Sequence, residues 1–261
     1  MNYFKKSLGQ NFLIDQNIIR KITSLIKIKG KDIIEIGPGS GALTDEILKN
    51  KPKSLTVIEK DTILFKELKK KYINQKIMKF YNDDVLKFKL EKICKKNSII
   101  LGNLPYNISS QILVKILRFD KWPPKVTDFI FMFQKELGEK IIGNFLSSNY
   151  GRLSILTNFK FNIINKFLVS KNCFYPKPKI TSIVIHFQPK INKLFKIKKI
   201  ENLEKVTNIL FSNKRKMINK NIKKILDNAS IKNILGLKIQ SRPSEIKPDI
   251  YYKITELYER K

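Results

Sequence analysis

Short apolar runs alternate with amphipathic stretches over the first half of the chain. Residues 17–28 carry apolar side chains at helical spacing, and 32–36 is a β-branched run that ends at a glycine-rich turn. The same alternation then repeats, which predicts helices over 44–49, 63–72 and 110–117 and strands over 54–58, 76–81, 98–101 and 128–133. Strands separated by helices of about 10–15 residues favour a mostly parallel, doubly wound α/β sheet.

The pattern changes after these elements. Residues 161–169 and 181–187 alternate as strands and are joined by a proline-rich turn, 174–178, so we expect an antiparallel edge pair. Beyond it no strand is predicted, and three stretches have helical spacing: 201–213, 216–228 and 244–260. We therefore expect two domains, an α/β domain over 1–188 and a small helical domain over 189–261.

Cysteine and histidine are too few for metal chemistry. Cys94, Cys173 and the single histidine, His186, form neither a disulfide framework nor a metal cluster, so we expect no metal site and a reducing, cytoplasmic location. The alternation around His186 predicts a strand residue on the less buried face. The basic N-terminus lacks the apolar core of a signal peptide, and the longest apolar run, 129–133, is too short to span a bilayer, so we expect no membrane contact.

Basic side chains dominate the composition. The chain has 53 Lys+Arg against 22 Asp+Glu, a formal net charge of +31, which favours an acidic partner and nucleic acid first. Lys outnumbers Arg 47 to 6 and Ile outnumbers Ala 42 to 2, so codon bias is the alternative explanation for part of this charge. Residues 1–188 carry 34 basic and 15 acidic side chains, and 189–261 carry 19 and 7. The denser charge of the shorter segment indicates a functional basic surface.

A glycine-rich segment, Glu-Ile-Gly-Pro-Gly-Ser-Gly, joins the first strand of the predicted sheet to its helix. Gly37 and Gly39 allow a tight turn and close approach to a ligand, and they also fit the dinucleotide-binding fingerprint. Glu59, at the end of the next strand, would bind ribose hydroxyls in either cofactor. An additional carboxylate at Glu35 favours a cationic ligand, S-adenosylmethionine, over the pyrophosphate of a dinucleotide.

An acidic pair follows the third strand of the predicted sheet. A carboxylate at Asp84 can accept the adenine amino proton of the cofactor while Val85 packs on the ring; alternatively, Asp83 and Asp84 only form a turn. Acids at the carboxyl ends of three successive strands favour a methyltransferase.

The tetrapeptide Asn103, Leu104, Pro105 and Tyr106 follows the fourth strand and holds the candidate catalytic residues. An exocyclic adenine amine is a weak nucleophile because its lone pair is delocalised into the ring. The side-chain carbonyl of Asn103 and a backbone carbonyl held outward by Pro105 can accept its two N–H bonds and aim the lone pair at the methyl group. Tyr106 offers a stacking face for the base.

This tetrapeptide resembles the N-(L/I)-P-Y motif of the ribosomal RNA adenine N6-dimethyltransferases. Further blocks resemble the same family: Gly9–Leu13 with Asp15, Glu35–Gly41, Tyr150–Ser154 and Phe174–Lys179. The resemblance implies a Rossmann-like class I methyltransferase fold and S-adenosylmethionine bound by Asn11, Leu13, Gly37, Gly39, Glu59, Asp84, Val85 and Asn103. It also implies that Phe174 lies on the face of the flipped target adenine opposite Tyr106.

The C-terminal part points to one branch of that family. Phe211–Lys220 resembles the F-x-(Q/N)-(R/K)-R-K block of the small-subunit enzymes of KsgA type, although Asn213-Lys214 and Ile180-Thr181 depart from the usual Gln-Arg and Val-Asp. That branch implies dimethylation of two adjacent adenines in the 3′-terminal hairpin loop of 16S rRNA, on an immature 30S subunit, by a monomer with a role in small-subunit biogenesis. Four basic residues expected on one helix would bind RNA phosphates: Lys214, Arg215, Lys216 and Lys220.

Three alternatives remain from the sequence. One is a large-subunit 23S rRNA methyltransferase of resistance type, and another is a non-catalytic factor that binds the pre-ribosome. The third is a nicotinamide-dependent reductase, which would use the glycine loop but give no role to Asn103–Tyr106 or to the basic C-terminal part.

Overall fold

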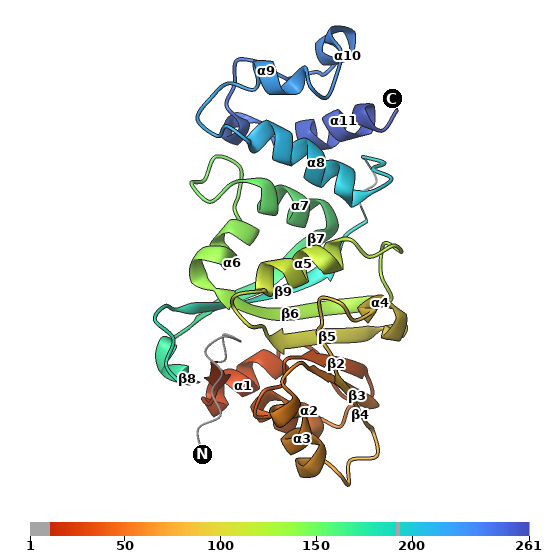
Figure 1. Ribbon diagram of the computed structural model, residues 1–261, viewed down its shortest axis with the longest axis vertical. Coiled ribbons are helices and arrows are strands. Elements are labelled where there is room, and N and C mark those ends of the chain that lie inside the picture. The colour runs from red at the N-terminus through yellow and green to blue at the C-terminus, as the bar shows by residue number, and fades with distance from the viewer. Residues whose placement is uncertain (1–10, 192–193, 261) are drawn as a thin grey trace. The chain divides into compact units, whose positions relative to one another are not determined.

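The computed structural model describes residues 11–191 and 194–260, and contacts between residues divide the chain into two units (Figure 1). The first unit comprises Met1–Gly138 and Asn162–Pro189, and the second comprises Glu139–Phe161 and Lys190–Lys261. The expected boundary at 188/189 placed residues 139–161 in the first domain, whereas the structure groups them with the C-terminal helices.

A seven-stranded sheet forms the core of the first unit, in the order β4-β3-β2-β5-β6-β9-β7. Its strands are β2 Asp32–Ile36, β3 Ser54–Glu59, β4 Met78–Asn82, β5 Ser98–Asn103, β6 Val126–Gln134, β7 Phe161–Val169 and β9 Ser182–Pro189. Strands β2 to β6 pair in parallel, and β9 pairs antiparallel with β6. The mostly parallel, doubly wound sheet predicted from the sequence is confirmed.

Four helices connect the parallel strands (Figure 1): α2 Ala42–Lys49, α3 Thr62–Lys71, α4 Leu90–Ile93 and α5 Ser109–Leu117. Helix α1, Gln16–Thr23, precedes β2, and α6, Lys135–Ile141, follows β6. Crossovers between parallel strands are right-handed, so α2 and α3 cover one face of the sheet and α4 and α5 cover the other. The strand order reverses between β2 and β5. Sheets of this class bind ligands outside the carboxyl ends of the strands at such a reversal.

A separate two-stranded sheet pairs β1, Phe12–Leu13, antiparallel with β8, Phe174–Tyr175. Leu13 lies opposite Phe174, so two of the sequence blocks noted above, far apart in the chain, are neighbours in space. The segment expected to be only a proline-rich turn therefore begins with a short strand. Gly9 and Gln10, which precede β1, lie outside the described residues.

His186 lies in β9, as expected, but the prediction that it occupies the less buried face is wrong. Its side chain is only 4% exposed, because Ser182–Phe187 are buried on both faces of β9. The Nε2 of His186 lies 2.8 Å from Oδ1 of Asp128, which also accepts a hydrogen bond from Gln188. Burial alone would raise the pKa of Asp128, but these hydrogen bonds outweigh burial and lower that pKa to about 2.

The second unit is helical and comprises α7 Arg152–Lys160, α8 Ile200–Phe211, α9 Asn219–Ile222, α10 Asn228–Lys232 and α11 Pro248–Tyr258. Helices α7, α8 and α11 pack on one another through fully buried side chains such as Ile155, Leu203 and Tyr251. The hydroxyl of Tyr252 also donates to the carbonyl of Ile155. These contacts explain why the segment that contains α7 groups with the C-terminal helices.

The helix predicted over 216–228 is wrong. A turn follows α8, α9 is only four residues long, and α10 begins separately at Asn228. Asp227 starts α10 because its carboxylate accepts the N–H of Ser230 and so caps the helix. The helix predicted over 244–260 starts later, at Pro248, since proline is favoured in the first helical turn. No helix in the described part of the chain is long and apolar enough to cross a membrane.

Candidate active site

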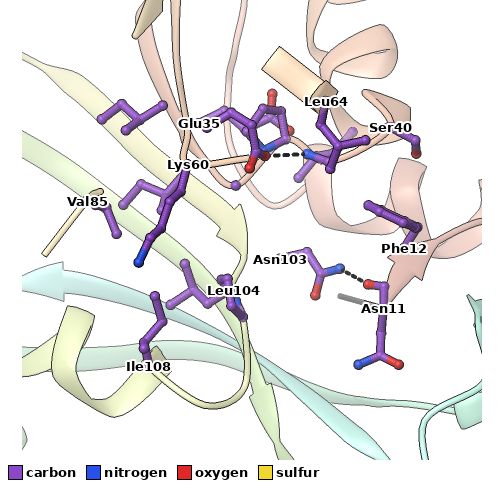
Figure 2. Close-up of a pocket in the computed structure, with 18 of the residues that line it drawn as sticks. Asn11, Phe12, Glu35, Ser40, Lys60, Leu64, Val85, Asn103, Leu104 and Ile108 are labelled. Carbon is purple, nitrogen blue, oxygen red and sulfur yellow. Dashed lines mark hydrogen bonds between the residues drawn. The ribbon is translucent and has the colours of Figure 1, made fainter. Parts of the chain in front are cut away.

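A cavity opens at the carboxyl ends of β2, β3, β4 and β5, where the strand order reverses (Figure 2). Eleven of the twelve residues that the sequence assigned to cofactor binding or catalysis line it: Asn11, Leu13, Gly37, Gly39, Glu59, Asp84, Val85, Asn103, Leu104, Pro105 and Tyr106. All of them belong to the first unit. Phe174 is the twelfth, and it is not among the lining residues.

The glycine loop after β2 is shaped by its lack of side chains. Gly39 has a φ of +57°, and a Cβ atom built there would lie 2.6 Å from the ring of Phe12, another residue of the cavity wall. The N–H of Gly39 donates to Oε2 of Glu59 over 3.2 Å, and the N–H of Asp61 donates to Oε1 over 2.8 Å. Both oxygens of the Glu59 carboxylate are thus fixed at the cavity wall.

Two buried carboxylates lie close to this loop. Burial raises the pKa of Glu59 although backbone N–H groups oppose the effect. Glu35, in β2, is 1% exposed, and Oγ1 of Thr44 donates to its carboxylate over 2.7 Å. Burial raises the pKa of Glu35 to about 8, and the negative charge of Glu59 adds to the increase. A cation placed in the cavity would stabilise the ionised form of both groups.

Asp84 closes the cavity on the side of β4. Its Oδ2 lies 2.8 Å from Nζ of Lys60, and its Oδ1 accepts the N–H of Leu86. The hydrogen bond from Lys60 lowers the pKa of Asp84, and the one from Leu86 adds to this. Lys60 and Leu64 line the cavity but were missed from the sequence (Figure 2). The only available signal for Lys60 was its place next to Glu59.

The charges of the cavity wall suit a ligand that combines a cation with hydroxyl groups. Glu35, Glu59, Asp83 and Asp84 all line the cavity, and Lys60 is the one basic side chain among the lining residues that the structure describes. The N–H of Gly39, which a phosphate would need, is engaged by Glu59. The wall therefore fits S-adenosylmethionine and disfavours the pyrophosphate of a dinucleotide.

The amide of Asn103 is held in one orientation. Its Nδ2 donates to the backbone carbonyl of Asn11 over 2.8 Å, as Figure 2 shows. Within the described part of the chain no donor bonds its Oδ1, so this oxygen stays available as an acceptor. A Cβ on Gly37 would lie 3.7 Å from Cδ of Pro105, which places the glycine loop in contact with the loop after β5.

Tyr106 is anchored at both ends. Its hydroxyl is hydrogen-bonded to Oγ of Ser182 in β9, and its carbonyl accepts from Oγ of Ser109 over 3.2 Å. Burial raises the pKa of Tyr106, so its phenol is protonated at neutral pH.

Residues 1–260 match the model of the family described as "Ribosomal RNA adenine dimethylase". The ribosomal RNA small subunit methyltransferase A of Pelagibacter ubique is 45% identical over 259 residues, which are 98% of this chain and 97% of that protein. The protein of the same name from Mycoplasma mobile is 40% identical over 95% of each chain. The chain belongs to the ribosomal RNA adenine dimethylase family. It is therefore a methyltransferase whose cofactor is S-adenosylmethionine.

Solved structures of two other enzymes have the same fold as this adenine dimethylase. A dimethyladenosine transferase from Plasmodium falciparum has a TM-score of 0.73 at 24% identity over 93% of this chain and 95% of that one. The 23S rRNA methyltransferase ErmE has a TM-score of 0.71 at 22% identity over 95% of this chain and 100% of that one. The Rossmann-like class I methyltransferase fold is confirmed. Since the second structure is that of a large-subunit enzyme, fold alone does not separate the two branches.

Phe174 of the adenine dimethylase chain is 3% exposed and belongs to the hydrophobic core with Leu13 and Val169. Its strand, β8, pairs with β1, whose two residues line the cavity together with the preceding Asn11. The neighbouring Tyr175 is 53% exposed. Contact between the ring of Phe174 and a target base stays a prediction, and it requires the ring to become more accessible than it is here.

The four basic residues assigned to RNA are all exposed, but they do not share one helix. Lys214, Arg215 and Lys216 lie in the turn between α8 and α9, and only Lys220 lies in α9. Across residues 11–191 and 194–260, no three Asp, Glu, His or Cys side chains are grouped as a metal site would require.

Proposed function

We propose that this chain N6,N6-dimethylates two adjacent adenines in the 3′-terminal hairpin loop of 16S rRNA. The observation that carries the proposal is the fixed orientation of the Asn103 amide. Its Nδ2 donates a hydrogen bond to the carbonyl of Asn11, so its Oδ1 remains available as an acceptor at the cavity wall. The exocyclic amine of the target adenine donates N–H bonds, so it needs a hydrogen-bond acceptor at this position and no strong base. The names of the relatives that are 45% and 40% identical support the small-subunit substrate over the large-subunit alternative.

Eight residues of the cavity wall are assigned to the cofactor: Asn11, Leu13, Gly37, Gly39, Glu59, Asp84, Val85 and Asn103. Glu59 would accept hydrogen bonds from ribose hydroxyls, Asp84 would accept the adenine amino proton, and Val85 would pack on the adenine ring. Gly37 and Gly39 give the close approach that their backbone conformations allow. When bound, S-adenosylmethionine supplies an electrophilic methyl group on a cationic sulfur.

The loop after β5 would position the acceptor amine. Oδ1 of Asn103 accepts one N–H of the target adenine, and a backbone carbonyl beside Pro105 accepts the other, which draws the lone pair out of the ring system. Tyr106 provides a stacking face, and Phe174 is assigned to the opposite face of the base. The base must leave its stack to reach this loop, as bases modified in helical nucleic acid do. After one methylation a single N–H remains, and Asn103 can still accept it.

The RNA would be held in part by the C-terminal unit. Lys214, Arg215, Lys216 and Lys220 are exposed cations that can neutralise phosphates without reading sequence. We assign them to the backbone of the 16S rRNA in an immature 30S subunit, and we expect the enzyme to act there as a cytoplasmic monomer.

Methyl transfer from labelled S-adenosylmethionine to ribosomal particles tests the function. The substrates are 30S and 50S particles from a strain whose small-subunit adenines are unmethylated, and the modified bases are mapped by primer extension. We expect label only in 30S particles, as dimethyladenine at two adjacent positions. Label in 50S particles alone would assign the chain to the large-subunit branch. A wild-type chain that binds the cofactor but labels neither particle would support the non-catalytic alternative.

A further inference from the structure

Ser182 is the first residue of β9, and its side chain is fully buried although its hydroxyl is polar. The hydroxyl is bonded to the phenol of Tyr106, with 2.5 Å between the two oxygens. Within the described part of the chain, the Ser182 hydroxyl makes no other hydrogen bond. In sequence the two residues are 76 positions apart. A buried serine whose side chain serves only the phenol of a residue in the cavity wall has a role that its own strand does not require.

We propose that Ser182 is a positioning residue that holds the ring of Tyr106 where the target adenine must stack. This inference rests on the proposed function, because it concerns the base that the enzyme would methylate. Ser182 itself is not among the residues that line the cavity, so we assign it no direct contact with the base.

The geometry of a phenol explains what this contact can fix. The oxygen of Tyr106 lies on the axis about which the ring rotates, so a hydrogen bond at that oxygen fixes the direction of the axis and leaves the rotation to packing. The other end of the residue is held by Ser109, which donates to the carbonyl of Tyr106. Because Asn103, the last residue of β5, is also hydrogen-bonded to Asn11, both the acceptor and the stacking face of the site are held in place.

The strand that carries Ser182 is itself firmly placed. Ser182 lies opposite Gln134 at the end of β6, and the next backbone contact joins the N–H of Lys135 to the carbonyl of Thr181. The sheet therefore supplies a rigid support for a ring that belongs to a loop. Loss of this support would leave the loop folded but allow the ring to move, and small displacements from the reactive geometry reduce rates by up to about 100-fold.

Ser182→Ala, Tyr106→Phe and the double variant test the inference, each on the unmethylated 30S particles described above. Both single variants remove the same hydrogen bond, so we expect each to lower kcat for methyl transfer about 10-fold or more. The Kd of S-adenosylmethionine, measured by titration calorimetry without RNA, should stay within about twofold of wild type. The double variant should be no worse than either single variant, because the second change removes a bond that is already lost.

Ser98→Ala is the matched control. Ser98 lies at the opposite end of β5, is also a buried serine, and its Oγ has no hydrogen-bond partner among the described residues. We expect this control to keep the wild-type kcat. The proposal is overturned if Ser182→Ala keeps the wild-type kcat, if the two losses multiply in the double variant, or if cofactor affinity falls in parallel with kcat. A wild-type chain that methylates neither particle would instead overturn the proposed function, and this inference with it.

Discussion

Replacing Gly39 by alanine tests how the glycine loop and β1 together form the cofactor site. Gly39 has a φ of +57°, where an L-residue is strained by about 1–2 kcal/mol. In addition, the new methyl group would lie 2.6 Å from the ring of Phe12, so the ring must move. That movement affects a second wall of the cavity, since Phe12 and its neighbours Asn11 and Leu13 all line it.

The structure provides a control for the backbone strain alone. Gly30 has a similar positive φ of +72°, and a Cβ built on it meets nothing within 4 Å. Gly30→Ala should therefore lower the free energy of unfolding by about 1 kcal/mol and leave cofactor binding unchanged. Gly39→Ala should weaken S-adenosylmethionine binding at least about tenfold, or about 1.4 kcal/mol.

Titration calorimetry for binding and urea unfolding for stability separate the two effects. If the ring of Phe12 is the obstacle, adding Phe12→Ala to Gly39→Ala should recover part of the lost stability even if affinity stays low. The reasoning is refuted if Gly39→Ala and Gly30→Ala bind the cofactor equally well. That result would mean that the loop accepts a side chain without disturbing β1.

Three further predictions follow from the site, the sheet and the C-terminal unit. Asn103→Ala should reduce kcat by about 100-fold or more with the cofactor Kd near wild type, and an equal loss of cofactor affinity would show that Asn103 has another role. Because the pKa of Asp128 is lowered to about 2 in the folded state, its ionised carboxylate should stabilise the fold above the unfolded pKa of about 4. This stabilisation should be lost as the pH falls from about 4 to about 2, and urea unfolding should show a weaker pH dependence for Asp128→Asn. Replacing Lys214, Arg215 and Lys216 by glutamate should weaken binding to 30S particles and make that binding less dependent on salt concentration. Unchanged binding would show that this turn does not contact the RNA.

Much of the candidate site was predictable because its residues are set by local sequence. A parallel sheet brings the carboxyl ends of its strands to one edge, so Glu59, Asp84 and Asn103 could be placed together once their strands were recognised. The glycine loop was predictable for the same reason, since it directly follows a β-branched run. No long-range information was needed for either.

The errors lie where distant segments decide the structure. His186 has the alternation of a half-exposed strand, but β9 is inserted between β6 and β7 and is covered on both faces. Residues 216–228 have helical spacing, yet Ile218 donates its N–H to the carbonyl of Ser241, and Asp227 starts a new helix instead of continuing the old one. Spacing along the chain contains no information on such contacts.

Ser182 shows the same limit within the site. In sequence it is one serine at the start of an apolar strand, and its assignment depends on a hydrogen bond to Tyr106, 76 positions away. Phe174 is the converse case: the family resemblance places its ring against the target base, while the structure buries it in the core. A resemblance carries over the residue type at a position but not the conformation of its side chain.

The distribution of charge divides the molecule into two kinds of surface. The net charge of +31 does not by itself indicate a basic ligand-binding surface, because a codon bias toward lysine would add positive charge along the whole chain. The cavity wall has the opposite charge: it gathers Glu35, Glu59, Asp83 and Asp84, and its only basic side chain within the described residues, Lys60, is paired with Asp84. Burial raises the pKa of Glu35 and of Glu59, and the charge of Glu59 raises that of Glu35 further, so a cationic ligand in the cavity would stabilise the ionised form of both carboxylates. The exposed cations of the turn after α8 suit the opposite kind of ligand, a phosphate backbone. Under the proposed function, a cationic cofactor and a polyanionic substrate would be bound by separate groups of residues, so each group could be altered without directly changing the affinity for the other ligand.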